Sequence, residues 1–237
     1  MTHPSINPYL TAGIPYPCAV LWDMDGVICD NGQLHYQAWV ETFQHLRGEH
    51  IPEELFKRTF GMNNFGALTL LLGQEPTAQE LDLLAEEKER IFRQLILGNV
   101  AFLPGVEEWL REFHCRGIPM AIASSAPQEN IDALRAELGL DRYLSVFVSA
   151  NEMPSKPSPA VFLKAAEVLG VAPQQCVVVE DAVAGVAAGR AGGMQVIAVT
   201  TTNPPDLLTE AHLVVDTLVE IDLPGWAADC PTNFQPG

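Results

Sequence analysis

Short apolar runs alternate with longer amphipathic stretches between about residue 104 and residue 215. The apolar runs contain few polar positions, which is typical of strands in a parallel sheet that is covered on both faces. The amphipathic stretches have the periodicity of helices, and some end at a glycine. The pattern predicts strands over 18–22, 119–123, 144–149, 176–180, 195–199 and 213–215, and helices over 105–116, 127–138, 159–169 and 182–191. This alternation indicates an α/β fold.

The segment between the first two predicted strands has a different pattern. Residues 33–98 contain no convincing strand, and proline and glycine divide them into helical pieces. The helices are expected over 33–47, 53–59, 64–72 and 78–97. Thr77, followed three residues later by Glu80, is typical of a capping box. We therefore expect a Rossmann-like, three-layer α/β/α core formed by residues 1–32 and 99–237, with 33–98 inserted as a small helical domain.

The composition narrows the classes of function. Of 237 residues, 48% are hydrophobic and 18% are charged, which is a globular composition. Thirty acidic against thirteen basic residues give a net charge of −17, so nucleic acids and anionic membranes are poor partners. No apolar run approaches the length of a bilayer span, and the N-terminus does not resemble a signal peptide. Five widely spaced cysteines argue against a disulfide framework, so we expect a cytoplasmic protein.

Side chains that can carry chemistry follow several of the predicted strands. They are Asp23 and Asp25 after the first strand, Ser124 after the second, Lys156 in a proline-flanked loop, and Glu180 with Asp181 after strand 176–180. In open parallel sheets, ligands and chemistry collect beyond the carboxyl ends of the strands. We therefore expect these side chains, which are far apart in the sequence, to meet at one edge of the sheet.

The chemistry of this set points to phosphoryl transfer. Several carboxylates in a small space repel one another unless a cation lies between them, and hard oxygen ligands suit Mg²⁺. The Ser124 hydroxyl stands at a strand-to-helix turn, where free backbone N–H groups favour a phosphate. Lys156 adds a fixed positive charge. A nucleophilic carboxylate, a metal ion, a hydroxyl and an ammonium group together form a phosphoryl-transfer site.

In order and spacing, these residues resemble the four motifs of the haloacid dehalogenase-like superfamily of phosphohydrolases. The motifs are Asp23-Met-Asp-Gly-Val-Ile-Cys-Asp30, Ser124, Lys156-Pro and Glu180-Asp181, and the resemblance covers roughly residues 17–220. A D-x-D-G motif alone is a weak signal, whereas four motifs in register at predicted strand ends are a strong one. The insertion at 33–98 resembles the small helical cap of subfamily I of this superfamily.

The resemblance implies a role for each core residue. Asp23 attacks phosphorus and forms an aspartyl-phosphate, while Ser124 and Lys156 hold the transferring phosphoryl group. The implied cofactor is Mg²⁺. Its implied ligands are Asp23, Asp181, the main-chain carbonyl of Asp25, and Glu180, which either binds through water or supports a ligand from beside it.

Asp25 is implied to be the general acid that protonates the leaving oxygen and later the base that activates water. This role requires the pKa of Asp25 to lie above that of Asp23, and a second carboxylate nearby would raise it. Dehalogenases need no acid at this position, and cation-pumping ATPases of the same lineage carry threonine there. An aspartate at position 25 therefore favours a phosphate monoester phosphatase or a phosphosugar mutase.

The start of the insertion resembles the β-phosphoglucomutase-like branch of the superfamily. The implied substrate-binding residues are His35 and Trp39 in an H-x-x-A-W pattern, Gly61 at a cap-loop glycine position, Asn64 and Ser125. His35 either assists Asp25 or positions the substrate. Mutases of this type carry arginine at the position of Asn64, and they carry lysine and asparagine where this chain has Ser125-Ala-Pro-Gln128. Both differences remove contacts to a second phosphate group.

These inferences predict a Mg²⁺-dependent phosphatase that acts on a small phosphorylated metabolite, with a sugar phosphate as the expected substrate class. The first alternative is a β-phosphoglucomutase, and a more distant one is a catalytically silent binding protein that has kept the fold. We expect a monomer or a weak homodimer. The run 86–89 and most basic residues of the insertion are expected on solvated helix faces. Gly185 and Gly189 are expected to allow close packing of a helix on the sheet.

Overall fold

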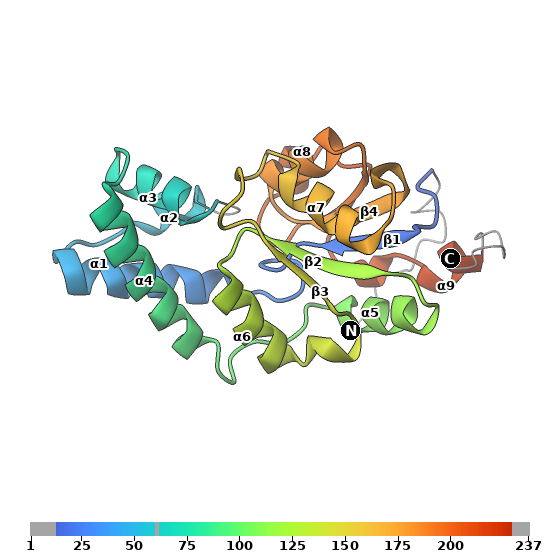
Figure 1. Cartoon of the computed structure of the whole chain (residues 1–237), viewed down its shortest axis with the longest axis horizontal. Helices are drawn as coiled ribbons and strands as arrows, with labels where there is room; N and C mark the ends of the chain where they lie inside the picture. The colour runs from blue at the N-terminus through green and yellow to red at the C-terminus, as the bar shows by residue number, and fades with distance from the viewer. Residues whose placement is uncertain (1–12, 60–61, 229–237) are drawn as a thin grey trace.

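The sheet has six parallel strands in the order β3-β2-β1-β4-β5-β6 within residues 13–59 and 62–228, the part of the chain that this computed structural model describes (Figure 1). The strands are β1 (Ala19–Trp22), β2 (Met120–Ser124), β3 (Val146–Ser149), β4 (Cys176–Glu180), β5 (Gln195–Val199) and β6 (Leu213–Val215). Every neighbouring pair runs parallel. The predicted α/β fold with parallel, apolar strands is therefore confirmed.

Helices cover both faces of the sheet. They are α5 (Val106–Cys115) and α6 (Gln128–Leu138) on one face, and α7 (Ala160–Leu169) and α8 (Val183–Ala191) on the other (Figure 1). Successive side chains of a strand point to opposite faces, so Trp22 packs in the apolar cluster of α5 and α6, and Leu21 packs in that of α7 and α8. The predicted close packing at Gly189 is confirmed, because a Cβ atom there would lie 2.8 Å from the Val196 side chain in β5.

Short helices lie in the connections and near the end of the described chain. They are η1 (Leu140–Arg142), η2 (Pro173–Gln175), η3 (Pro205–Leu207), η4 (Leu218–Glu220) and α9 (Leu223–Ala228). In α9, Trp226 packs at 5.7 Å from the ring of Trp109 in α5 and donates a hydrogen bond to the carbonyl oxygen of Ile14. This contact ties both ends of the described chain to the same face of the sheet.

Residues 32–59 and 62–95 form a helical lobe between β1 and α5. Its helices are α1 (Gly32–Arg47), α2 (Glu53–Lys57), α3 (Asn64–Leu72) and α4 (Ala78–Leu95). Trp39 and Leu84 belong to an apolar cluster of the lobe, distinct from the two clusters at the sheet. The predicted capping box is present, since Thr77 Oγ1 accepts from the Glu80 N–H and the Glu80 carboxylate accepts from the Thr77 N–H.

Helix α2 is shorter than predicted and ends at Lys57. The N–H and the hydroxyl of Thr59 both donate to the carbonyl oxygen of Phe56 at 2.7 Å. These bonds close a tight turn in place of further helical hydrogen bonds. Side-chain hydrogen bonding of this local kind competes with helix continuation, and helical periodicity alone does not reveal it.

The carboxyl ends of β1, β2 and β4 lie side by side, because β1 pairs with β2 on one side and with β4 on the other. The chain leaves the sheet after β1 to form the helical lobe and returns to it at α5, so the lobe lies beyond this edge (Figure 1). Ligands of open parallel sheets bind at such an edge, where the strand order changes direction. The fold therefore places the loops after these strands opposite the lobe.

Candidate active site

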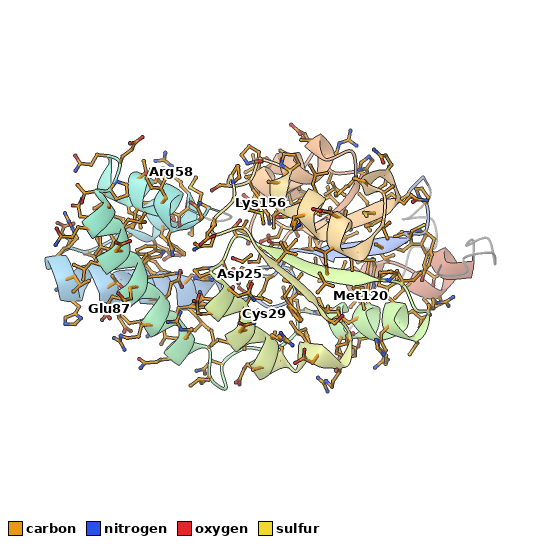
Figure 2. All side chains as sticks on the ribbon, in the orientation of Figure 1. Asp25, Cys29, Arg58, Glu87, Met120 and Lys156 are labelled. Carbon is orange, nitrogen blue, oxygen red and sulfur yellow. The ribbon has the colours of Figure 1, made fainter. Side chains whose placement is uncertain are left out.

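A cavity of about 730 Å³, counted with the solvent at its mouth, lies between the carboxyl ends of the strands and the helical lobe. The sheet side contributes Asp23, Asp25, Ser124, Ser125, Glu180 and Asp181, and the lobe contributes His35, Trp39, Asn64, Lys88 and Glu89. Figure 2 shows Asp25 and Lys156 where the lobe meets the sheet. The structure thus brings the predicted residues of both parts of the chain together, while Gly61 lies outside the described residues.

Lys156 lies between two carboxylates at the floor of the site. Its ammonium group donates to Asp23 Oδ1 and, at 2.6 Å, to Glu180 Oε1, and its side chain is 1% exposed. Glu180 Oε2 accepts from the N–H groups of Asp181 and Ala182, both at 2.8 Å. Burial lowers the pKa of Lys156, but the two carboxylates outweigh it and raise the pKa above its ordinary value. Glu180 is therefore fixed by the backbone and in turn fixes Lys156.

Two glycines allow the backbone to approach these carboxylates. Gly26, in the first motif, has φ +83°, and a Cβ atom there would lie 2.0 Å from Asp181 Oδ2. Gly185, in α8, has an ordinary helical backbone, but its Cβ atom would lie 1.7 Å from Glu180 Oε1. The close packing predicted for Gly185 is thus packing against a site carboxylate, and any larger side chain would displace it.

Asp181 is held by two residues that sequence reasoning missed. Thr202 Oγ1 donates to Asp181 Oδ2, and Asn203 Nδ2 donates to the main-chain oxygen of Asp181 at 3.0 Å. Both residues follow β5, which ends at the same edge of the sheet. The rule that located the other polar residues, inspection of each strand end, would also have located Thr202 and Asn203.

Three buried carboxyl groups are arranged as they would be around a cation. Asp23, Glu180 and Asp181 each offer an oxygen, and these oxygens lie within 4.8 Å of one another. Burial first, and then neighbouring carboxylates, raise the pKa of Asp23 to about 8 and that of Asp181 well above its ordinary value. A divalent cation would remove this penalty, and carboxylate oxygens suit it. Since both oxygens of Glu180 already accept hydrogen bonds, Asp23 and Asp181 are the better ligands.

Asp25 has a different electrostatic environment from Asp23. Asn31 Nδ2 donates to Asp25 Oδ1 at 2.5 Å, and His35 Nε2 lies 3.6 Å from Asp25 Oδ2. Burial acts to raise the pKa of Asp25, but His35 and Asn31 outweigh it and lower the pKa. In this arrangement the pKa of Asp25 is lowered and that of Asp23 is raised, which is the reverse of the order that proton donation by Asp25 requires. Polar donors surround Asp25, whereas carboxylates and a dry environment surround Asp23.

His35 connects the sheet side of the cavity to the lobe. Its ring stacks on Phe92, with centroids 3.9 Å apart and an angle of 11° between the planes. His35 Nδ1 lies 3.0 Å from Lys88 Nζ, which donates to both carboxylate oxygens of Glu89 at 2.9 and 3.0 Å. Asp25, His35, Lys88 and Glu89 therefore form a row of polar groups across the cavity, in which the 3.6 Å separation of His35 and Asp25 is the longest.

The burial of Lys88 and Glu89 corrects the expectation of a solvated helix face over 86–89. Their exposed fractions are 4% and 5%. Lys88 lies four residues after Leu84 and four before Phe92, on the buried side of α4. The opposite charges of Lys88 and Glu89 compensate each other, which makes the burial of both tolerable. This Leu84–Lys88–Phe92 spacing is the sequence signal that could have placed Lys88 in the site.

Glu89 also links the lobe to the sheet. Asn64 Nδ2 donates to Glu89 Oε1 at 2.9 Å, and Asn130 Nδ2, from α6, donates to Glu89 Oε2 at 2.5 Å. Arg93 Nη1 in turn donates to Asn130 Oδ1 at 3.0 Å. Asn64 thus lines the cavity as predicted in position, but its amide nitrogen binds a carboxylate of the lobe.

The remaining predicted residues line the cavity in their own ways. Ser124 is buried at the end of β2, and its Oγ accepts from the Ala126 N–H at 3.1 Å. Ser125 follows it at the cavity wall. Trp39 belongs to the apolar cluster of the lobe, and Lys88 Nζ lies 5.5 Å from the centroid of its ring. Cavity residues that sequence reasoning missed are Phe56, Thr59, Met62, Asn63, Ala67, Ala126, Pro127, Asn130 and Ala182.

Comparison with known sequences gives a family and relatives of named activity. The sequence model of the haloacid dehalogenase-like hydrolase family matches residues 19–193. The chain is 35% identical over 184 residues to the fructose-1-phosphate phosphatase of Escherichia coli, a match that covers 75% of this chain and 94% of that protein.

A second relative is longer than this chain. The chain is 29% identical over 221 residues to the chloroplastic 5-amino-6-(5-phospho-D-ribitylamino)uracil phosphatase of Arabidopsis thaliana. The match covers 91% of this chain and 59% of that protein, so the chain spans about three fifths of its length. Among solved structures, a β-phosphoglucomutase from Clostridium difficile is similar, with a TM-score of 0.79, 27% identity, and coverage of 90% of this chain and 98% of that chain.

Proposed function

Because the chain belongs to the haloacid dehalogenase-like hydrolase family, we propose that it is a Mg²⁺-dependent phosphatase that hydrolyses a small phosphorylated metabolite, with a sugar phosphate as its substrate class. The observation that carries the proposal is the position of Lys156 between Asp23 and Glu180, which both line the cavity under the lobe together with Asp181. This arrangement supplies a nucleophile, a cation to hold phosphate and a place for a metal ion. The relative named as a fructose-1-phosphate phosphatase supports the substrate class.

Asp23 is the proposed nucleophile. Its carboxylate oxygen attacks phosphorus, the bond from phosphorus to the ester oxygen breaks, and an aspartyl-phosphate forms. Water then attacks the same phosphorus, which releases inorganic phosphate and restores the Asp23 carboxylate. Lys156 and Ser124 hold the phosphoryl oxygens during both steps, and Lys156 is already oriented by Glu180.

Asp25 is proposed to move the protons of both steps. It donates a proton to the leaving oxygen and later accepts one from the attacking water, so the protein returns to its starting protonation. The lowered pKa of Asp25 suits the second step, in which a carboxylate is needed. A phosphate dianion bound beside Asp25 brings like charge, which raises its pKa toward the value that the first step needs.

The proposed metal ion is Mg²⁺, held by Asp23 and Asp181 with Glu180 beside them. When bound, it neutralises negative charge on the transferring phosphoryl group. Asp181 is kept in place for this purpose by Thr202 and Asn203.

The helical lobe, with residues 33–98 as its proposed bounds, acts as a cap over the site. The hydrogen bonds from Asn130 to Glu89 and from Arg93 to Asn130 join the lobe to α6. A closed cavity excludes bulk water and strengthens the electrostatic interactions inside it.

The location of the protein in the cytoplasm and its state as a monomer or weak homodimer stay predictions. No helix among residues 13–59 and 62–228 is long and apolar enough to cross a bilayer.

Phosphate release from sugar phosphates tests the proposed function. Hexose and hexitol monophosphates, β-glucose 1-phosphate among them, are incubated with the protein, Mg²⁺ and a trace of glucose 1,6-bisphosphate. We expect at least one ester to be consumed with equimolar release of inorganic phosphate. Conversion of β-glucose 1-phosphate to glucose 6-phosphate with little free phosphate would instead identify a mutase. Absence of any reaction would support the silent binding protein.

The contact between Gly185 and Glu180 gives a sharper test of the site. In Gly185→Ala, the added methyl group displaces the Glu180 carboxylate, and Lys156 loses the partner that orients it. We expect kcat to fall about a hundredfold, as when one preorganised charge-stabilising group is lost. Gly192→Ala, at the end of the same helix, is the matched control, because its Cβ atom would have no neighbour closer than 3.4 Å. Equal kcat values for the two variants would show that Glu180 does not position Lys156.

A further inference from the structure

On the lobe side of the cavity, the positive charge of Lys88 is neutralised by the neighbouring carboxylate of Glu89. Among the described residues, the charged groups of the lobe at the cavity are Lys88, Glu89 and the titratable His35. An ammonium group has three N–H donors. Lys88 Nζ has three short contacts, to His35 Nδ1 and to the two oxygens of Glu89. Its donors are therefore all committed within the protein, although it faces the cavity.

Glu89 is held by further hydrogen bonds in the position in which it accepts from the Lys88 ammonium group. Asn64 and Asn130 each donate to one of its oxygens, so the carboxylate does not depend on Lys88 alone for its orientation. Burial acts to raise the pKa of Glu89, but Lys88 and the other polar neighbours outweigh it and lower the pKa. The Lys88–Glu89 unit thus presents no net charge to a ligand in the cavity.

A second cavity, next to the site, is also unfavourable for an anionic ligand. The second cavity has a volume of about 1040 Å³, counted with its open mouth, and it continues the site cavity outward between α4 and α6. The residues that line both cavities are Asn63, Asn64, Glu89 and Pro127. The wall of the second cavity adds the acidic residues Asp82, Glu86 and Glu129. Arg93 also lines it and donates to Asn130. An anionic group that entered by this route would meet a negative wall, which is unfavourable at these distances.

We propose that Glu89 is a specificity-determining residue: by occupying Lys88, it restricts the substrate to monophosphates with an uncharged, hydroxylated leaving group and excludes bisphosphates. This inference rests on the proposed function, because it concerns the part of the substrate that faces the lobe while Asp23 attacks the phosphate. Neutral hydrogen-bonding groups such as Asn63 and Thr59, beside the apolar Trp39, suit the hydroxyl groups and carbon skeleton of such a leaving group.

Binding of two esters that differ only in a second phosphate tests the inference. The affinities of fructose 1-phosphate and fructose 1,6-bisphosphate are measured by calorimetry with Mg²⁺ on the Asp23→Asn variant, which retains the ester. We expect the bisphosphate to bind about tenfold more weakly. Adding Glu89→Gln frees Lys88 to form charge-assisted hydrogen bonds, and we expect the ratio of the two affinities to shift toward the bisphosphate by tenfold or more.

Glu86→Gln is the matched control, since it removes the same charge from α4 at a residue that lines only the second cavity. We expect it to change the ratio less than threefold. Equal affinities for the two esters, binding of neither, or an equal shift in Glu86→Gln and Glu89→Gln would overturn the inference. If Glu89→Gln does not fold, equal affinities of the two esters for Asp23→Asn alone would still overturn the inference. Phosphate release by the wild-type protein is followed in parallel, so that failure of the proposed function is seen separately.

Discussion

Asp23→Asn lowers kcat for phosphate monoesters about ten-thousandfold or more and leaves the protein folded. An amide has neither the charge nor the nucleophilicity to attack phosphorus, and it is a poorer ligand for a divalent cation. Asparagine has nearly the same shape as aspartate, and Lys156 keeps its hydrogen bond to Glu180, so the buried ammonium is not left alone. The measurement is phosphate release at saturating substrate, together with the thermal midpoint of unfolding.

Asp30→Asn is the matched control for this prediction. Asp30 belongs to the same motif, but it is exposed and lies outside the residues that line the cavity. We expect its kcat to stay within about twofold of the wild-type value, as for surface substitutions away from a site. If Asp23→Asn kept activity within tenfold of the wild type, Asp23 would not be the nucleophile.

Removal of divalent cations abolishes turnover, and added Mg²⁺ restores it. Without a cation, burial and mutual repulsion raise the pKa of Asp23 and Asp181, so the charged form of the nucleophile is disfavoured. We expect at least about a thousandfold loss of kcat in excess chelator, full recovery with Mg²⁺, and poor recovery with Ca²⁺, whose looser coordination disfavours in-line geometry. Full activity in excess chelator would contradict the metal requirement.

Cation binding can also be measured without an activity assay, from the thermal midpoint of unfolding. A ligand that binds the folded state raises the unfolding midpoint, so Mg²⁺ is expected to stabilise the wild-type protein against heat. Asp181→Asn should remove most of this shift, because it removes a proposed ligand that Thr202 and Asn203 hold in place. Asp206→Asn, at a residue outside the site cavity, should keep the shift.

The sheet was predictable because each strand can be recognised from the residues of its own segment. Each strand is a run of apolar residues bounded by polar ones, and a parallel sheet buried on both faces requires that composition. The residues at the strand ends then follow from topology, since adjacent parallel strands end at one edge. This is why Asp23, Ser124 and Asp181 could be placed together before their contacts were known. Thr202 and Asn203 obey the same rule and needed only a wider application of it.

The lobe was less predictable because the spacing of Leu84, Lys88 and Phe92 can place Lys88 on the buried side of α4 but does not show which residues that side contacts. Lys88 and Glu89 were predicted to lie on the surface, because charged side chains are usually exposed to solvent. Their burial depends on partners from three other elements: His35 in α1, Asn64 in α3 and Asn130 in α6. The lowered pKa of Asp25 was not predictable for a similar reason. It depends on Asn31 and His35 as neighbours of Asp25, which the motif spacing alone does not show.

The most direct test of the account is to trap the phosphorylated protein. The enzyme is mixed with a sugar phosphate that it hydrolyses, quenched in acid within the first turnover, and digested for peptide mass spectrometry. The account predicts a phosphoryl group on the carboxylate of Asp23, absent from Asp23→Asn and lost on treatment with base, as expected of an acyl phosphate. Turnover with no phosphorylated peptide at any quench time, or phosphorylation of a different residue, would contradict it.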